Sequence, residues 1–305
     1  MKSSIVKSHL FVSLATLIIA GSFLVSEKLS GIANPVSLTL LRFVGAAAIL
    51  LPIVLYKPEW RNRIPSTLPR AMVISLFFSI FFICLFEALK TTTSLNTGTL
   101  HTLVPFTTAF LSRFIFKEKI SKTKLVAYMF GVLGTTWVVF GGQLEMLLSF
   151  SLNSGDFIFL AGAVFMCLYS ISMKFLYRDD HMLVLVFCIL VGGSIWMVIA
   201  LALTGQPLQW HLIRGVSIIH MLYLIIFATL LTVYLYQKST VVLGPSRVMA
   251  YIYLNPAAVG ILLILLDQVA IPLIVLPGIL ISVVVTIILQ IDQTQQVSRV
   301  PADKE

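Results

Sequence analysis

Charged residues are scarce in this sequence. They make up 11% of the 305 residues, whereas 59% of the residues are hydrophobic. A soluble globular protein carries about 25% charged residues, so this chain lacks the side chains that would cover a water-exposed surface. The composition therefore excludes a soluble domain of this size and indicates a protein embedded in a membrane.

Cysteine is also rare. The three cysteines, Cys84, Cys167 and Cys188, lie inside apolar stretches and show no C-x-x-C spacing. Isolated cysteines of this kind usually act as small apolar side chains. Neither a disulfide framework nor a zinc site is expected, and we predict no metal and no cofactor.

Several enzyme motifs are missing. The sequence contains no H-E-x-x-H, no G-x-S-x-G and no Walker sequence G-x-x-x-x-G-K-[ST]. No carboxylate lies near the middle of an apolar stretch. These absences argue against an enzyme, and the lack of a soluble output domain argues against a receptor. A membrane-embedded enzyme or a receptor without a soluble domain is kept as an alternative function.

Long apolar stretches fill the chain instead. A helix needs about 20 residues to cross the hydrocarbon core, whereas barrel strands would be about 10 residues long and alternate in polarity. The sequence therefore predicts an all-α polytopic membrane protein with ten transmembrane helices. The predicted spans are 10–25, 35–56, 71–89, 95–116, 125–140, 157–175, 182–203, 218–236, 248–266 and 271–291.

The first span has a second interpretation as a signal peptide, because Lys2 and Lys7 precede it. Residues 22–27, with the sequence SFLVSE, contain no A-x-A-like cleavage site. We therefore expect this segment to be kept as a transmembrane helix.

The basic residues are distributed unevenly, and the formal net charge is +9. The amino terminus, every second connection and the carboxyl-terminal tail lie on one side of the membrane, and together they contain 17 of the 21 Lys and Arg residues. The connections on the other side contain only Lys28, Lys90 and Arg214, and Arg42 lies inside a span. Short cytoplasmic loops carry such an excess. We predict an inner-membrane protein with both termini in the cytoplasm. The excess suits anionic lipid headgroups, and no nucleic-acid partner is expected.

Two weak internal similarities relate the halves of the chain. Residues 20–28 align with residues 166–174 at an offset of 146, and Pro105 aligns with Pro256 at an offset of 151. The alternative is that hydrophobic segments align by chance. Prolines at the same place in the fourth and ninth spans favour a true repeat.

The repeats define the predicted domains, which are residues 8–141 and 155–291, followed by a cytoplasmic tail at 292–305. Each repeat contains five spans. Because five is odd, the second repeat is inverted relative to the first, which is a recurring architecture of secondary transporters.

Several short motifs follow the order and spacing of a known family. They are Leu41-Arg42-Phe43, Ala88-Leu89, Pro105, Lys117-Glu118 and the segment 250–256 with the sequence AYIYLNP. With these motifs the chain resembles, over nearly its whole length, the EamA-type members of the drug/metabolite transporter superfamily. It departs from that family at Ala20 and Met166, where tryptophan is usual, and at Asp267, where glutamate is usual.

The resemblance implies a secondary active transporter, a permease or exporter, that works by alternating access. Its substrate would be a small organic metabolite such as an amino acid or a related amphiphilic compound. Spans one to four and six to nine would line the cavity, and the two five-span halves would rock around it. The expected partners are this substrate and the lipid bilayer, and a homodimer is compatible with the sequence.

Arg42 is the one basic residue placed well inside a predicted span, roughly 10 Å below the outer interface. A guanidinium there could bind a substrate carboxylate or phosphate through two parallel hydrogen bonds. It could instead pair with Glu87 at the end of the third span. We favour the structural or gating role, since a buried arginine needs a partner.

The fourth span carries a polar stripe. His101, Pro105, Thr108 and Ser112 share one helical face, and such a face avoids lipid. Pro105 removes a backbone hydrogen bond and frees a carbonyl group. We expect the stripe to line a cavity, and ordinary hydrogen bonding between helices is the alternative.

The remaining candidates come from other spans. Tyr251, Asn255 and Pro256 in the ninth span and Tyr169 in the sixth are predicted to line the cavity, with packing as the alternative for Tyr169. Four carboxylates lie near outer helix ends. Two of them, Glu27 and Glu87, are candidates for gating or coupling, and the other two, Asp156 and Asp267, are expected to be solvated.

Overall fold

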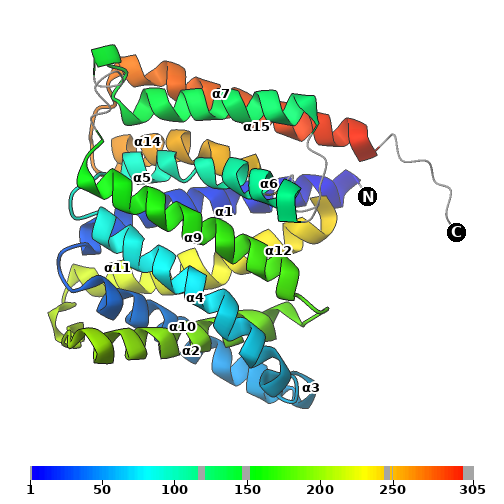
Figure 1. Ribbon diagram of the computed structural model, residues 1–305, viewed down its shortest axis with the longest axis vertical. Coiled ribbons are helices and arrows are strands. Elements are labelled where there is room, and N and C mark those ends of the chain that lie inside the picture. Colours follow the sequence, from blue (N-terminus) through cyan, green and yellow to red (C-terminus); the bar gives the residue numbers. More distant parts are fainter. Residues whose placement is uncertain (1, 116–120, 146–151, 244–247, 249, 298–305) are drawn as a thin grey trace, which may run out of the picture. The chain divides into compact units, whose positions relative to one another are not determined.

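The computed structural model describes residues 2–115, 121–145, 152–243, 248 and 250–297 (Figure 1). Every regular element in this part of the chain is a helix. The first half contains α1 (Lys2–Leu29), α2 (Pro35–Tyr56), α3 (Pro58–Arg61), α4 (Ile64–Ala88), α5 (Ser94–Leu100), α6 (Leu103–Ile115) and α7 (Lys122–Val139). The second half contains α9 (Ser154–Leu176), α10 (Met182–Thr204), η1 (Trp210–Leu212), α11 (Val216–Ile225), η2 (Ile226–Leu231), α12 (Thr232–Leu243), η3 (Tyr251–Leu254), α14 (Asn255–Leu266), η4 (Leu273–Val275) and α15 (Leu276–Val297).

Each of the ten predicted stretches contains helix, but not all of them are single long helices. Within the described residues, seven helical segments are long and apolar enough to cross a membrane, and a shorter apolar helix covers Tyr251–Leu266. The fourth stretch is divided into α5 and α6, and the ninth into η3 and α14. These are the two spans that contain the matching prolines, Pro105 and Pro256.

The chain forms two compact units that do not follow the predicted repeats. The first unit contains residues 1–21, 98–152 and 232–305, and the second contains residues 22–97 and 153–231. Each unit thus combines segments from both halves of the sequence. The two five-span halves are not the compact bodies of this structure.

The second unit is built around α4, which packs against α9 and α10, while α2 packs against α10 and α11. Small residues bring these helices close together. A Cβ atom on Gly193 of α10 would lie 2.7 Å from the ring of Phe43 on α2. Close packing through glycine is typical of helix contacts in membranes, where apolar burial between helices gives no driving force.

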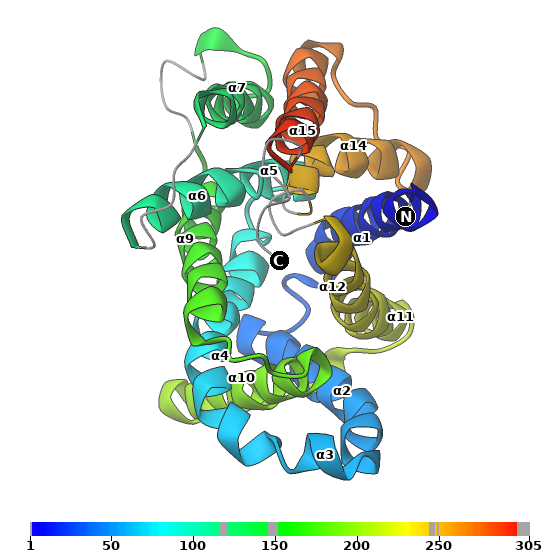
Figure 2. The same ribbon diagram turned by 90° about the vertical axis from the view of Figure 1, so that its right-hand side faces the viewer.

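The first unit contains a matching close contact between α7 and α15, which lie side by side in both views (Figures 1 and 2). A Cβ atom on Gly134 would lie 2.9 Å from the carbonyl oxygen of Gly278. Next to this contact, Ala127, Ala250, Tyr253, Val285 and Leu289 form a buried apolar cluster. The fifth and tenth predicted spans are therefore direct partners.

Some features of the sequence lie outside the described residues. They are the Lys117-Glu118 pair, the connection at 244–247 and the tail beyond residue 297. Nothing is described of the side chain of Ser112, although its backbone belongs to α6.

Candidate functional site

Two prolines determine where the fourth and ninth spans are broken. Proline has no N–H for the carbonyl four residues before it, and its ring clashes with that carbonyl. The residue four positions before Pro105 is His101, which lies in the turn between α5 and α6. The corresponding residue for Pro256 is Ile252, which lies in the 3-10 turn η3. Both breaks therefore lie one turn before a proline.

The carbonyl groups at the two breaks are satisfied in the same way. The Val104 N–H donates to the carbonyl oxygen of His101 at 3.1 Å, and the Asn255 N–H donates to that of Ile252. The prediction of a free carbonyl group at His101 is therefore wrong, because the tighter turn brings the Val104 N–H within hydrogen-bonding distance of it. In each span the donor is the residue directly before the proline.

His101 and Asn255 form a buried polar pair in the first unit. His101 Nδ1 and Asn255 Nδ2 lie 3.1 Å apart, and the two residues are 5% and 1% exposed. Asn255 Oδ1 is buried without a hydrogen-bond partner in the described part of the chain, and so is the hydroxyl of Tyr253. Two sequence-predicted residues are thus brought together, and one acceptor of the pair, Asn255 Oδ1, remains unsatisfied.

Tyr251 does not join this pair directly, but bonds to a residue that the sequence analysis missed. Its hydroxyl lies 2.7 Å from Nδ1 of His9 on α1, and the rings are 6.1 Å apart. A histidine near the start of a span is an ordinary interface residue by sequence alone. His9 lies directly before the predicted span 10–25 and became part of α1 only in the structure, so no signal in the sequence pointed to this contact.

Thr108 is the other described polar residue of the predicted stripe. Its hydroxyl oxygen is buried and has no hydrogen-bond partner among the described residues. The neighbouring Thr107 hydroxyl, by contrast, donates to the carbonyl oxygen of Leu103 at 3.0 Å. Thr108 therefore has an unsatisfied group, whereas its neighbour is occupied by its own helix.

Arg42 lies in the second unit and is 3% exposed. Its Nε–H donates to Thr229 Oγ1 at 2.9 Å, and an Nη2 hydrogen donates to the carbonyl oxygen of Ala228 at 3.4 Å. Both acceptors belong to η2, a π-helical segment. Such segments interrupt α-helices and occur often at functional sites.

The expected pair between Arg42 and Glu87 does not form. Glu87 instead accepts from Lys90 Nζ at 2.6 Å, and Arg42 Nη1 is buried with no hydrogen-bond partner in the described part of the chain. A charged arginine inside a membrane span costs about 2.5–3.5 kcal/mol on insertion scales. A guanidinium that still has a free donor is suited to bind an anion.

An aromatic ring packs against this arginine. The guanidinium carbon lies 4.2 Å from the centroid of the Phe82 ring, a cation–π contact. Phe82 packs edge-on against Phe78 at 4.8 Å, and Phe78 stacks on Tyr169 at 4.6 Å. The predicted residue Tyr169 therefore belongs to the same aromatic cluster as Phe82, the ring that contacts Arg42.

Glu27 has a structural contact in the second unit. Its Oε2 accepts the backbone N–H of Ser94 at 3.1 Å, where α5 begins. A carboxylate at this position compensates the positive end of the helix. Like the pairing of Glu87 with Lys90, this contact gives the carboxylate a local partner.

Asp156 was expected to be solvated, and this expectation is wrong. Its side chain is 2% exposed. It forms a capping box with Asn153 at the start of α9, and it also accepts hydrogen bonds from the Thr92 hydroxyl and the Asn96 amide. The N-x-x-D spacing at 153–156 is a helix-start signal and could have identified this role.

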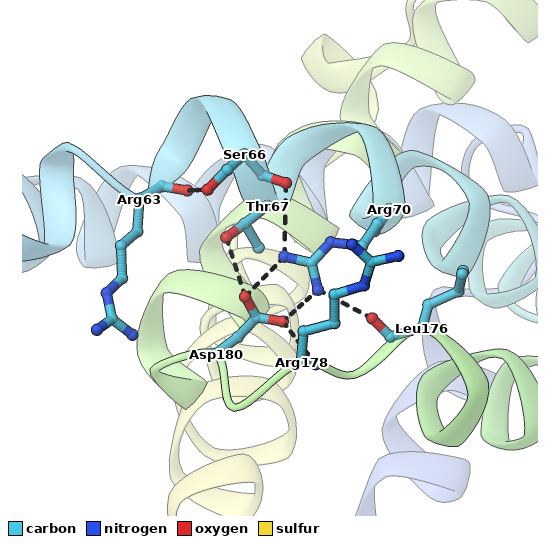
Figure 3. A network of polar contacts seen from close by, with 7 residues as sticks. All are labelled: Arg63, Ser66, Thr67, Arg70, Leu176, Arg178 and Asp180. Carbon is cyan, nitrogen blue, oxygen red and sulfur yellow. Dashed lines mark hydrogen bonds and ion pairs between the residues drawn. The ribbon is translucent and has the colours of Figure 1, made fainter.

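A polar network at the other end of α4 was also missed (Figure 3). Asp180 accepts two hydrogen bonds from Arg70, at 2.7 and 2.8 Å, one from Thr67 at 3.3 Å and one from the Arg178 N–H at 3.3 Å. Burial opposes ionisation of Asp180, but these donors outweigh it and lower the pKa of the carboxyl group. The network ties α4 to the connection between α9 and α10.

A groove on the second unit contains none of the predicted site residues. It has a volume of about 480 Å³ and lies along α2 and α10. Its lining is apolar except for Ser194, with side chains such as Leu40, Val44, Phe187 and Ile195. A groove of this chemistry matches lipid acyl chains and offers no group that would select a polar solute.

Within the described residues, no group of three or more His, Cys, Asp or Glu side chains is arranged to hold a metal ion. The polar groups that remain unsatisfied are single donors or acceptors, such as Arg42 Nη1, Asn255 Oδ1 and the Tyr253 hydroxyl. They suit recognition of an organic solute by hydrogen bonds.

Comparison with known proteins gives three findings. The EamA-like transporter family model matches residues 6–140 and 153–290. The uncharacterized transporter YyaM of Bacillus subtilis (strain 168) is 25% identical over 193 residues, so the chain spans 62% of the length of this curated relative. A solved crystal structure aligns with 97% of this chain and 99% of its own, at 19% identity and a TM-score of 0.64. At that identity, the structural match concerns the fold alone.

Proposed function

Because the chain belongs to the EamA-like transporter family, we propose that it moves a small organic metabolite across a membrane as a secondary active transporter, by alternating access. It is a multi-pass integral membrane protein, with seven long apolar segments among its described residues. Since the sequence contains no Walker motif, the energy would come from a solute or ion gradient.

The observation that carries the proposal is the unsatisfied guanidinium of Arg42. A carboxylate could accept from Nη1, whose N–H groups have no other acceptor in the described part of the chain, and hydrogen bonds to charged groups contribute about 1.5–3 kcal/mol. The rings of Phe82, Phe78 and Tyr169 would contact an apolar part of the same solute. This combination favours an amino acid or a related amphiphilic carboxylate as the substrate.

Helix pairing supports the inverted repeats at 8–141 and 155–291. The closely packed helices α2 and α10 correspond to the second and seventh spans, and α7 and α15 to the fifth and tenth. Each pair would join equivalent spans of the two repeats. The equivalent hydrogen bonds before Pro105 and Pro256 agree with the same correspondence. Broken helices in matching positions are typical of substrate sites in secondary transporters.

The proposed location is the inner membrane, with both termini in the cytoplasm, and it rests on the uneven distribution of basic residues. A reporter that is active only in the cytoplasm, fused to the carboxyl terminus, tests this orientation. Activity of an exported reporter at the same position would reverse it.

Transport by purified protein in proteoliposomes tests the function. We expect counterflow of at least one radiolabelled carboxylate from a panel of amino acids and related metabolites. Arg42→Gln should weaken its apparent affinity about tenfold or more, in keeping with the loss of a charge-assisted hydrogen bond. Arg214→Gln removes the same charge from an exposed position and should transport normally. If no solute in the panel moves, transport of this class is rejected; if solutes move equally well in Arg42→Gln, only the role of the arginine is rejected.

A further inference from the structure

The short helix α3 lies where two membrane spans end. α2 ends at Tyr56 and α4 begins at Ile64, so the connection between them contains only seven residues. Helix α3 has no buried residue. Since both flanking helices are long enough to cross a membrane, this connection lies at the level of the lipid headgroups.

A groove opens at this level, which we call the interfacial groove. It is lined by Pro52, Ile53, Tyr56, Lys57 and Trp60 and has a volume of about 350 Å³. Its first three residues belong to the last turns of α2, and Tyr56 is 83% exposed. The groove thus has an apolar wall on the membrane side. The Lys57 cation and the Trp60 indole ring lie at the end that faces the lipid headgroups. Tyrosine and tryptophan are enriched at this depth of a bilayer.

The outer end of the groove is an ordered stack. Lys57 Nζ lies 4.4 Å from the centroid of the Trp60 ring, and this ring stacks on the imidazole of His181 with centroids 4.1 Å apart. His181 Nδ1 is buried and has no hydrogen-bond partner in the described part of the chain. The stack therefore fixes a cation above an indole and leaves one ring nitrogen unsatisfied.

The local charge is positive. Lys57, Arg61 and Arg63 are opposed by Glu59 on the same connection. Asp180, next to His181 in the chain, is occupied by Arg70. Burial, and then the charges of Lys57 and Arg63, lower the pKa of His181, as expected in a positive potential with no anion present.

We propose that the interfacial groove binds an anionic phospholipid, with the headgroup phosphate at Lys57 and Arg63 and the first part of an acyl chain along Pro52, Ile53 and Tyr56. The positive charge attracts the phosphate, and each basic residue near an anionic surface strengthens the binding. The apolar wall selects a lipid over a soluble phosphate, because a free anion would gain nothing from it. This site does not depend on the transported solute.

Lipid binding to the purified full-length protein tests the proposal. Native mass spectrometry in detergent would compare dioleoyl phosphatidylglycerol with dioleoyl phosphatidylcholine. We expect the wild-type protein to prefer the anionic lipid, and Lys57→Gln/Arg63→Gln to lower this preference at least about tenfold, given the contribution of each basic residue. The control Lys28→Gln/Arg214→Gln removes two exposed cations, one in the last turn of α1 and one before α11, and should keep the preference.

A second measurement uses only the wild-type protein. The imidazole resonances of His181, followed by NMR against pH, should report a higher pKa with phosphatidylglycerol than with phosphatidylcholine, since a nearby phosphate favours the protonated ring. An unchanged His181 titration, equal binding of the two lipids, or displacement of phosphatidylglycerol by millimolar inorganic phosphate would each overturn the proposal.

Discussion

His101 and Asn255 are joined across 3.1 Å by two side-chain nitrogen atoms, Nδ1 and Nδ2. An amide nitrogen can only donate, so Nδ1 of the imidazole accepts and carries no proton in this arrangement. A proton placed on Nδ1 would break this bond. The amide could then rotate and present Oδ1, which has no partner among the described residues. The pair can thus form a hydrogen bond in either protonation state of Nδ1, with the amide facing opposite ways.

The energy of this pair can be measured. We expect Asn255→Leu to lower the free energy of unfolding by about 1–3 kcal/mol, because the buried His101 side chain would lose its hydrogen bond to Asn255. Thermal unfolding in detergent would compare Asn255→Leu, His101→Phe and the double variant. In the double variant both polar partners are gone, so its loss should be smaller than the sum of the single losses. Additive losses would mean that the two side chains do not interact.

Pro105 is expected to maintain the break between α5 and α6. Pro105→Ala supplies an N–H for the carbonyl oxygen of His101 and removes the ring clash, so the two helices can join. We expect a folded protein with a transport rate several-fold below that of the wild type, since joining the helices would reorient His101. Pro207→Ala, in the exposed connection after α10, is the control. A wild-type rate in Pro105→Ala would show that the break is not needed for transport.

The contact between α7 and α15 should not tolerate a larger residue. Gly134→Ala places a methyl group 2.9 Å from the carbonyl oxygen of Gly278, and overpacking costs about 1–3 kcal/mol. We expect a lower melting temperature in detergent. At Gly260 an added methyl group would have its nearest neighbour at 3.8 Å, so Gly260→Ala serves as the matched control. Equal melting temperatures for the two variants would contradict the packing described here.

The network around Asp180 predicts a dependence of stability on pH. The pKa of Asp180 is lower in the folded protein than its usual value, chiefly because Arg70 and other donors outweigh the effect of burial. The stabilisation that these hydrogen bonds provide is fully present above the pKa that Asp180 has in the unfolded chain, about 3.9, and it is lost as the pH falls below that value. We expect Asp180→Asn to melt several degrees below the wild type at pH 7, and this difference to shrink below about pH 4. A constant difference from pH 7 to pH 3 would contradict this account.

The helical class and the approximate positions of the long apolar helices could be predicted from the sequence. The length and polarity of the apolar stretches are local properties, and a proline acts on its own helix. The same local rule predicts that a break lies one turn before Pro105. The hydrogen bond from the Val104 N–H to the carbonyl oxygen of His101, however, could be identified only from the three-dimensional structure of the turn.

Side-chain partners could not be predicted in the same way. Arg42 binds η2, which is 186 residues away along the chain, and hydropathy contains no information about which distant carbonyl a guanidinium will meet. Asp156 was misplaced because its position near a helix end suggested water, whereas Thr92 and Asn96 cover it. The pairing of His101 with Asn255 joins two residues that the sequence had selected separately.

The pairing of α7 with α15 has a consequence for synthesis. A ribosome would complete α7 at Val139 but would begin α15 only at Leu276. The small-residue face around Gly134 therefore remains in the bilayer without its partner helix while more than a hundred further residues are synthesised. During that interval other apolar helices can pack against this face of α7, because in lipid no hydrophobic effect drives one particular pair of helices together. Final assembly of this contact would therefore follow insertion of α15, and a truncated protein that lacks α15 should be an early target of membrane quality-control proteases.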